Sequence, residues 1–331
     1  MTYSDLTWTR LRRAAVIALA LSALSLSGCS TTGSSGGTAA ARATPVPTVA
    51  SGTTPSSTIA SRSRFPGSLY VSIGDSYAAG YQPTSAVSGG TSRNGFAYQV
   101  AEQSQSTASP LQLVNFGCSG ATSSMVVTTI GCTAAALGPD GTAYPDTTQA
   151  AAAVSFLAAH RGAIGLVTII IGGNDVKACL TSADSRHCME TVVPVLRRNL
   201  AALVKAVRAA VDPAVPVVGL TYPDVFLGVA LQRDAASITL AKESLVLFSS
   251  YLNPALRDAY TGNGARFLDI TSATGAYGSA EATQESADYG TIPTPVARIC
   301  TLTFYCQYQD IHPRTAGYRL IATLVVQEAL R

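Results

Sequence analysis

Residues 69–77, Leu-Tyr-Val-Ser-Ile-Gly-Asp-Ser-Tyr, join a short apolar run to a glycine, an aspartate and a serine. We expect the apolar part to form a strand and the polar part to turn into a helix. A second polar block, Asp310-Ile311-His312-Pro313, lies just before the last predicted helix. Serine is a weak nucleophile at neutral pH and needs a base within hydrogen-bond reach. Ser76 and His312 are therefore a candidate nucleophile and base, in a chain order that differs from chymotrypsin-like and subtilisin-like enzymes.

Apolar runs alternate with helical patterns along the rest of the chain. We predict five strands, at residues 69–73, 111–116, 166–171, 215–220 and 266–270. We predict helices at 148–160, from Pro194 in a first turn to 211, at 235–260 with a break near Asn253-Pro254, and at 315–330. Nearly continuous apolar strands between helices indicate a parallel sheet that is covered on both faces. The predicted fold is therefore α/β, with a three-layer α/β/α arrangement around a five-stranded parallel sheet.

Three polar positions follow three of these strands. Ser76 comes after the first predicted strand, Gly120 after the second and Asn174 after the third. Ligands of open parallel sheets gather outside the carboxyl ends of the strands. We therefore expect these three residues to line one edge of the sheet.

Four blocks of sequence resemble those of the GDSL, or SGNH, hydrolase family. They are Gly74-Asp75-Ser76-Tyr77, with Tyr where Leu is common, and then residues 115–122 (Asn-Phe-Gly-Cys-Ser-Gly-Ala-Thr), 172–175 (Gly-Gly-Asn-Asp) and 310–313. The resemblance covers essentially the whole domain and implies a flavodoxin-like hydrolase fold with Ser76 as nucleophile and His312 as base. It implies an oxyanion hole made by the Ser76 N–H, the Gly120 N–H and the Asn174 side-chain amide, and it implies no metal and no cofactor.

The acidic partner of His312 departs from the family pattern. The family often has Asp three residues before the histidine, where this chain has Gln309, and Asp310 is only two residues before. Either the Asp310 carboxylate or a backbone carbonyl would hold the correct histidine tautomer, and we favour Asp310. Asp75 and Asp175 are interpreted as local hydrogen-bond supports.

The plainer interpretations of these residues are structural. Ser76 would cap the following helix, and Gly120 and Asn174 would be turn residues. Only two other histidines exist, and neither His160 nor His187 lies in one of the four blocks. His312 is therefore the best candidate base.

The first 65 residues have the character of a leader and a linker. Arg10, Arg12 and Arg13 precede an apolar run, 14–26, that is too short for a permanent membrane span. Its end, Leu26-Ser27-Gly28-Cys29, resembles a bacterial lipobox, which implies a signal peptide over 1–28 and lipid attachment to Cys29; an ordinary signal peptide is the alternative. The Ser-, Thr-, Gly- and Pro-rich residues 29–65 predict a disordered tether. We expect the hydrolase domain at 66–331, held through its lipid on the outer face of the cell membrane, or secreted without the lipid.

The chain has seven cysteines. Without Cys29, six remain, for which 15 connectivities are possible. Proximity along the chain favours Cys118–Cys132, Cys179–Cys188 and Cys300–Cys306, and disulfides indicate an oxidising compartment. None of these cysteines has the Cys-x-x-Cys spacing of zinc motifs, so we expect no metal site.

Composition narrows the functions that remain. The net charge is +3 and no basic run follows the tether, so we expect no nucleic-acid partner. The only tryptophan is Trp8, in the leader, which favours lipid or short-chain acyl esters over acetylated polysaccharide as substrates. We expect a monomeric esterase or lipase in which residues 271–309 shape the substrate pocket or form a surface excursion. The alternatives are an acyltransferase, a carbohydrate acetylesterase and a non-catalytic surface lipoprotein.

Overall fold

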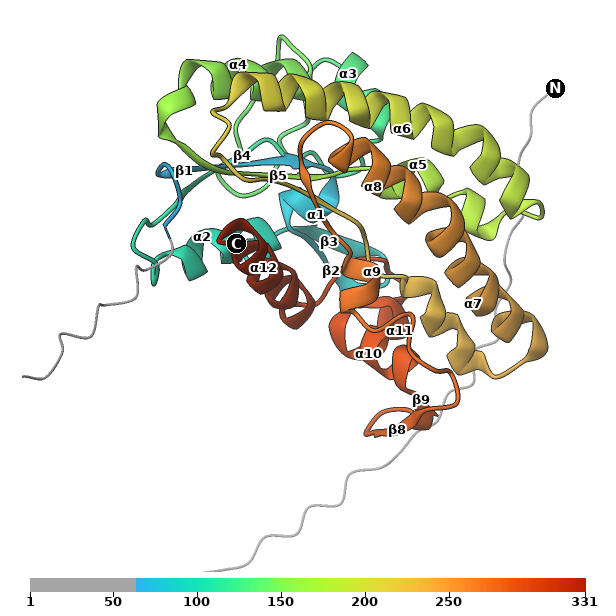
Figure 1. The fold of residues 1–331 in the computed structure, drawn as a ribbon. Coiled ribbons are helices and arrows are strands. Elements are labelled where there is room, and N and C mark those ends of the chain that lie inside the picture. Colours follow the sequence, from blue (N-terminus) through green and yellow to red (C-terminus); the bar gives the residue numbers. More distant parts are fainter. Residues whose placement is uncertain (1–63) are drawn as a thin grey trace, which may run out of the picture. The chain divides into compact units, whose positions relative to one another are not determined.

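The structure, a computed structural model, describes residues 64–331 (Figure 1). The predicted signal peptide, the lipidation site Cys29 and the predicted tether, apart from its last two residues, lie outside the described residues. Phe65 is buried in the hydrophobic core, with 4% of its surface exposed. Core packing therefore begins one residue before the predicted domain boundary.

A five-stranded parallel sheet forms the centre of the domain, as predicted. Its strands are β1 (Leu69–Gly74), β4 (Gln112–Asn115), β5 (Ile164–Ile170), β6 (Val217–Leu220) and β7 (Arg266–Leu268). Their order is β4-β1-β5-β6-β7, with every neighbouring pair parallel. All seven residues of β5 are buried, as expected for a strand covered on both faces. The predicted strand ends agree with these bounds to within two residues.

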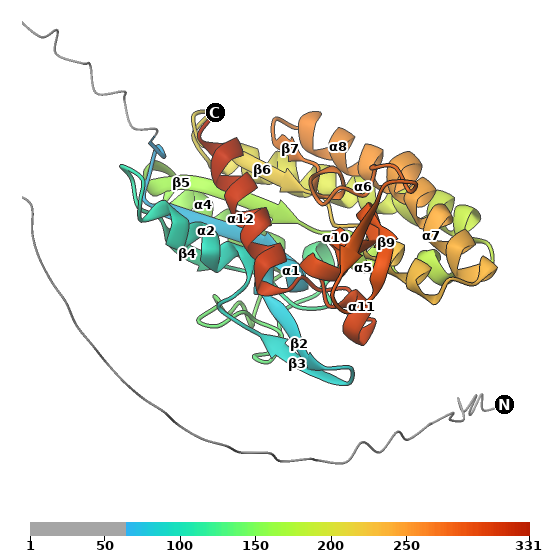
Figure 2. The ribbon, with the colours of Figure 1, turned by 90° about the horizontal axis from the view of Figure 1, so that it is seen from below.

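Helices cover both faces of the sheet and confirm the three-layer α/β/α fold (Figures 1 and 2). One face is covered by α4 (Gln149–Ala159), α6 (Ser185–Ala210) and α8 (Asn253–Thr261). The opposite face is covered by α2 (Phe96–Ser104) and α12 (Thr315–Ala329), which pack on each other. The core fills the two interfaces between these helices and the sheet.

The remaining elements are short, apart from α7 and α10. They are α1 (Ser76–Ala79), β2 (Tyr81–Ser85), β3 (Ser88–Thr91), α3 (Ser123–Thr128), η1 (Arg161–Ala163), α5 (Gly173–Val176), η2 (Cys179–Thr181), η3 (Val225–Gln232), α7 (Ala235–Leu247), η4 (Phe248–Leu252), α9 (Ile270–Ala273), β8 (Thr283–Ser286), β9 (Gly290–Pro293), α10 (Thr294–Leu302) and α11 (Tyr305–Tyr308).

The prediction for the start of α6 was wrong. Pro194 lies inside the helix, which begins nine residues earlier at Ser185. The Asp184 side chain accepts a hydrogen bond from the His187 N–H at 3.2 Å and caps the first turn. A proline removes one N–H from a helix, and here its usual acceptor would be the carbonyl of Glu190, an exposed residue that water can reach. The cap and the solvent exposure together explain why the helix runs through the proline.

The predicted interruption near Asn253-Pro254 is confirmed in its position, but it is a change of helix type and not a break in the chain of helices. Helices α7 and α8 are joined by the π-helical turn η4, and Pro254 lies in the first turn of α8. A π-turn inserts an extra residue without ending the helix. The chain therefore passes from α7 to α8 without a loop.

Two further properties follow from the described residues. No helix within residues 64–331 has the length and hydropathy to cross a membrane. Nor do these residues contain a group of three or more histidine, cysteine, aspartate or glutamate side chains arranged to hold a metal ion.

Candidate active site

Three predicted site residues stand where neighbouring strands end. Ser76 opens α1 directly after β1, Gly120 follows β4, and Asn174 lies in α5 after β5. Strands β4 and β5 flank β1 in the sheet. Since parallel strands end at the same edge, the fold brings these three residues to one edge.

The turn before Ser76 depends on a glycine. Gly74 has φ +149°, and a Cβ at this position would lie 2.0 Å from the Ile170 carbonyl oxygen. Only glycine allows this close approach of two strands at the turn. The Asp75 side chain then accepts a hydrogen bond from the Tyr77 N–H at 2.9 Å and caps α1. The result is a tight strand-to-helix turn that carries Ser76, 4% exposed, at its tip.

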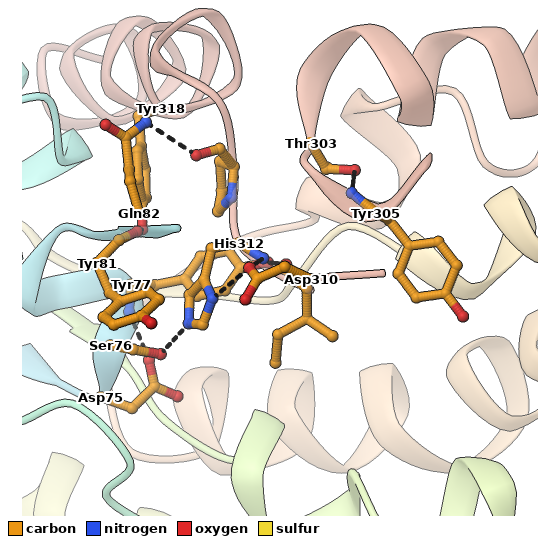
Figure 3. Close-up of polar contacts among 12 residues, drawn as sticks. Asp75, Ser76, Tyr77, Tyr81, Gln82, Thr303, Tyr305, Asp310, His312 and Tyr318 are labelled. Atoms are coloured by element: carbon orange, nitrogen blue, oxygen red, sulfur yellow. Dashed lines mark hydrogen bonds and ion pairs between the residues drawn. The ribbon is translucent and has the colours of Figure 1, made fainter. Parts of the chain in front are cut away.

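A row of hydrogen bonds links Ser76 to the end of the chain (Figure 3). His312 Nε2 lies 2.8 Å from Ser76 Oγ, and His312 Nδ1 lies 2.7 Å from Asp310 Oδ1. Ser76 and His312 are separated by 236 positions in sequence. With Nδ1 donating to the carboxylate, Nε2 is left as an acceptor for the serine proton. The arrangement can therefore activate a hydroxyl by general-base catalysis.

Asp310 reaches His312 although it stands only two residues before it. The same oxygen, Asp310 Oδ1, accepts the His312 backbone N–H at 2.9 Å, and the preceding Gln309 has φ +55°. Burial acts to raise the pKa of Asp310, but hydrogen bonds from His312 and its charge outweigh burial and leave the pKa below its usual value. The carboxylate is ionised at neutral pH. Of the two orienting groups considered from the sequence, the structure places the carboxylate at Nδ1.

The candidate oxyanion donors Gly120 and Asn174 follow the two strands that flank β1. Gly120 has φ +87° and is exposed, and within residues 64–331 its N–H has no hydrogen-bond partner. The Asn174 amide donates to the Ala121 carbonyl at 2.9 Å, which orients its nitrogen and leaves a second N–H. The loop that holds Gly120 packs closely on α1. The approach is so close that a Cβ on Gly117 would lie 2.6 Å from the Ala79 nitrogen. Asn174 and Ser76 line one cavity, whereas Gly120 is not among its lining residues.

Asp75 and Asp175 have structural partners. Asp75 also accepts a hydrogen bond from the Tyr222 hydroxyl at 2.6 Å. Burial raises the pKa of Asp75 to about 7, because the hydrogen bonds from Tyr222 and the Tyr77 N–H lower the pKa by less than burial raises it. Asp175, in α5, accepts both the N–H and the hydroxyl of Ser123, the first residue of α3, at 2.8 and 2.5 Å, so it joins these two short helices rather than supporting its own turn alone. These carboxyls connect the polar blocks to each other and to the strand ends.

Sequence reasoning missed several residues that hold the row in place. The Gln149 amide bonds both the N–H and the carbonyl of Gly74, at 3.1 and 3.0 Å. The Tyr81 ring lies 4.4 Å from the His312 ring between centroids, and the Gln82 amide donates to the Pro313 carbonyl at 3.1 Å (Figure 3). No local pattern marks these residues, because their partners lie far away in sequence.

One feature of the sequence could have pointed to Tyr77, because it stands where the first block of the family commonly has leucine. Its hydroxyl donates to the Ile311 carbonyl at 2.6 Å, directly before His312. Its ring centroid lies 5.8 Å from that of His312. Burial raises the pKa of Tyr77 well above its usual value, so the phenol stays a neutral donor. Tyr77 thus joins the serine turn to the histidine loop.

We expect Tyr77→Phe to lower kcat about tenfold with little change in KM, because losing one hydrogen bond to the histidine loop loosens its position. Steady-state ester hydrolysis and thermal unfolding check this. Tyr260→Phe is the matched control: its hydroxyl donates to the Ile169 carbonyl at 3.0 Å in the core, away from His312. Both variants should lose about 1–2 kcal/mol of stability. An equal loss of kcat in both would show that Tyr77 acts only through stability.

The three disulfides stand beside three of the blocks. The structure joins Cys118 to Cys132, Cys179 to Cys188 and Cys300 to Cys306, the pairing that proximity along the chain favours. The first lies in the Gly120 loop and the second follows α5. The third encloses Phe304, whose N–H donates to the His312 carbonyl at 3.0 Å. Three disulfides are typical of an extracellular or exported protein.

An apolar cavity opens beside Ser76 and Asn174. It encloses about 450 Å³, counting its open mouth. Its apolar walls include Leu180, Val225, Phe226, Phe248, Leu252 and Ile311. No residue of 271–309 lines it, so the expectation that this stretch shapes the pocket was wrong for this cavity. The stretch instead folds into α9, β8, β9, α10 and α11, and touches the cavity wall from behind, where Tyr305 and Phe226 have ring centroids 5.5 Å apart.

A serine, a histidine and an aspartate in hydrogen-bond contact, at the carboxyl edge of a five-stranded parallel sheet, define an SGNH-type hydrolase arrangement. The model of the GDSL-like lipase/acylhydrolase family matches residues 72–320, which include all four blocks. The chain therefore belongs to this family of hydrolases.

The solved structures that the chain matches are distant from it in sequence. The native aryl esterase of M. smegmatis is 15% identical, with a TM-score of 0.43, and the match covers 79% of this chain and 98% of that chain. A carbohydrate acetylesterase from Sinorhizobium meliloti, Est24, is 14% identical, with a TM-score of 0.39, and the match covers 78% of this chain and 99% of that chain. No curated protein sequence matches the chain significantly.

Proposed function

We propose that the protein is a serine esterase that hydrolyses carboxylic esters through an acyl-serine intermediate. The single observation that carries the proposal is the row Ser76–His312–Asp310, with contacts of 2.8 and 2.7 Å, at an apolar cavity. A hydroxyl next to an oriented imidazole is the arrangement that acyl transfer requires.

In the proposed first half-reaction, His312 Nε2 takes the Ser76 proton while Oγ attacks the ester carbonyl carbon. The carbonyl oxygen becomes an oxyanion, which the N–H groups of Ser76 and Gly120 and the Asn174 amide stabilise. The tetrahedral intermediate then collapses, the bond to the alcohol oxygen breaks, and the imidazolium gives its proton to the leaving alcohol. Asp310 stabilises the imidazolium without taking its proton.

In the second half-reaction, water replaces the alcohol. His312 removes a proton from the water, whose oxygen attacks the acyl-serine carbonyl. Collapse of the second tetrahedral intermediate releases the carboxylic acid, and the proton on His312 returns to Ser76 Oγ. Every step uses residues of this chain alone.

The cavity favours an apolar acyl group of limited length. The space inside it that remains free for a ligand is small, about 30 Å³, which favours a short acyl group. Phe248 and Leu252, which are 4% and 0% exposed, are buried residues of its wall. We propose a small acyl ester or lipid as substrate, a monomer as the active form, and an exported protein that is tethered through Cys29.

A series of p-nitrophenyl esters with acyl chains of increasing length tests the function. We expect kcat/KM to peak at short or medium chains and then to fall by about tenfold or more, because a chain longer than the cavity leaves methylenes in water. Rates of the Ser76→Ala protein are subtracted as background. Turnover of no ester in the series would contradict the proposal.

Added alcohols separate hydrolysis from acyl transfer. For an esterase, the free carboxylic acid remains the main product when an alcohol acceptor is present at millimolar concentration. If the acyl group passes mainly to the added alcohol, the protein is an acyltransferase that uses the same serine.

A further inference from the structure

A second apolar cavity lies away from Ser76, between α7, η3, strand β9, the segment 276–280 and the start of α10. We call it the α7 groove. Helix α7, α10 and β9 are labelled on the right side of Figure 2. The space free for a ligand in the groove is about 360 Å³. Its apolar walls include Leu227, Leu231, Ile238, Leu245, Ile292 and Val296.

The α7 groove is separate from the Ser76 cavity, because no residue lines both. Segment η3 forms a wall between them. Val225 and Phe226, at its start, face the Ser76 cavity, whereas Leu227 and Leu231 face the groove. A ligand in the groove would therefore not occupy the position of the ester.

Helix α7 turns an apolar stripe toward the groove. Ile238, Ala241 and Leu245 are spaced three and four residues apart, so they lie on one face of α7, and Lys242 lines the groove beside them. Ile238 is 39% exposed, one of few large apolar side chains of the described region with that exposure. An open concave surface of this kind is typical of a binding site for an apolar ligand.

The charges on the α7 groove have one sign. Arg233 and Lys242 line it, and no aspartate or glutamate does. Among residues 64–331, neither cation forms an ion pair with a carboxylate, and Arg233 makes only one long hydrogen bond, 3.4 Å, to the Tyr289 carbonyl. Apolar walls with two unpaired cations complement an apolar chain that ends in an anion.

We propose that the α7 groove binds one long-chain fatty acid, with its alkyl chain on the apolar walls and its carboxylate between Arg233 and Lys242. The concave shape fits a single chain better than it fits a flat membrane surface. The unpaired cations favour a carboxylate over an uncharged ester of the same chain. Binding at this groove requires no reaction at Ser76, so the inference stands independently of the proposed esterase activity.

Direct binding tests the inference. The full chain with Ser76→Ala is titrated with a fluorescent long-chain fatty acid, which is then displaced by unlabelled palmitic acid or by methyl palmitate. We expect palmitic acid to displace the probe at a concentration about tenfold lower than methyl palmitate, as one charge-assisted interaction would give. The double variant Arg233→Ala, Lys242→Ala should lose this preference.

Three further variants locate the site. Ala241→Trp fills the groove from α7 and should weaken binding of both the acid and the ester at least about tenfold, because the added ring occupies the space of the chain. Ile311→Trp narrows the Ser76 cavity and should leave the affinity for fatty acid unchanged. Arg198→Ala, Lys205→Ala removes two exposed cations of α6 and is the matched charge control. Thermal unfolding confirms that each variant is folded.

Several results would overturn the inference. They are equal displacement by acid and ester, an equal loss in the α6 control, loss of binding in Ile311→Trp but not in Ala241→Trp, and no binding of the probe at all. Binding to anionic phospholipid vesicles that depends on Arg233 and Lys242, without binding of monomeric fatty acid, would replace the fatty acid by a membrane surface. Association of two copies that buries Ile238 would replace it by a protein partner.

Discussion

Ser76→Ala should reduce ester hydrolysis about 10⁴–10⁶-fold, because no other group can form the acyl-enzyme and the remaining rate comes only from binding and the oxyanion donors. The Ser76 side chain is 4% exposed and opens onto the cavity, so the alanine keeps the fold and the cavity shape. The variant should also resist labelling by fluorophosphonates. Initial rates with p-nitrophenyl esters and mass spectrometry of the labelled protein measure both effects.

Ser249→Ala provides the control for Ser76→Ala. Ser249 is an exposed serine on η4 whose hydroxyl contacts only the Val246 carbonyl, at 3.4 Å. Its loss should change the rate less than about twofold, since it removes one exposed, weak hydrogen bond. Fluorophosphonate labelling of the Ser76→Ala protein at another serine, with hydrolysis retained, would refute the assignment of Ser76.

His312→Ala should cost nearly as much as the loss of Ser76, about 10⁴–10⁶-fold in kcat, because the base and the nucleophile act as one unit. The double variant Ser76→Ala, His312→Ala should be no slower than either single variant. The value of kcat is measured over a range of pH values. More than one tenth of the activity remaining in His312→Ala would contradict the role of His312.

Asp310→Asn isolates the orienting group of His312. The amide fills the same space, but it can present an N–H where the carboxylate accepts from Nδ1 at 2.7 Å. A histidine in the wrong tautomer lowers kcat about 10³–10⁴-fold in serine enzymes with this arrangement. A loss below about tenfold would instead favour a backbone carbonyl as the orienting group.

The sheet could be predicted because its cause is local. Short apolar runs rich in β-branched residues, such as 166–171, are typical of strands covered on both faces, and the helical spacing of apolar residues in 148–160 and 315–330 predicts the helices that cover them. The start of α6 could not be predicted from Pro194, because the Asp184 cap gives a start nine residues earlier. The stretch 271–309 has short elements without a clear period, and two of them, α10 and α11, pack against η3.

The residues of the candidate site also fall into two groups, those that the local sequence predicts and those that it does not. Ser76, Gly120, Asn174 and His312 are visible in the sequence, because their chemistry and their places after strands or before the last helix form recognisable blocks. Their supports are not visible. The Gln149 amide holds Gly74 across 75 positions, and Tyr222 reaches Asp75 across 147, contacts that no window of sequence contains.

The sequence by itself determined the parallel α/β fold and the family, and it marked the candidate reacting groups, because burial patterns and turn chemistry act over a few neighbouring residues. Only the tertiary structure decided that Asp310 reaches the imidazole, that η3 and η4 rather than 271–309 line the cavity at Ser76, and that a second groove lies behind η3. These outcomes depend on distances between segments far apart in the chain. Such distances are set by the simultaneous close packing of the whole core and not by any one stretch of residues.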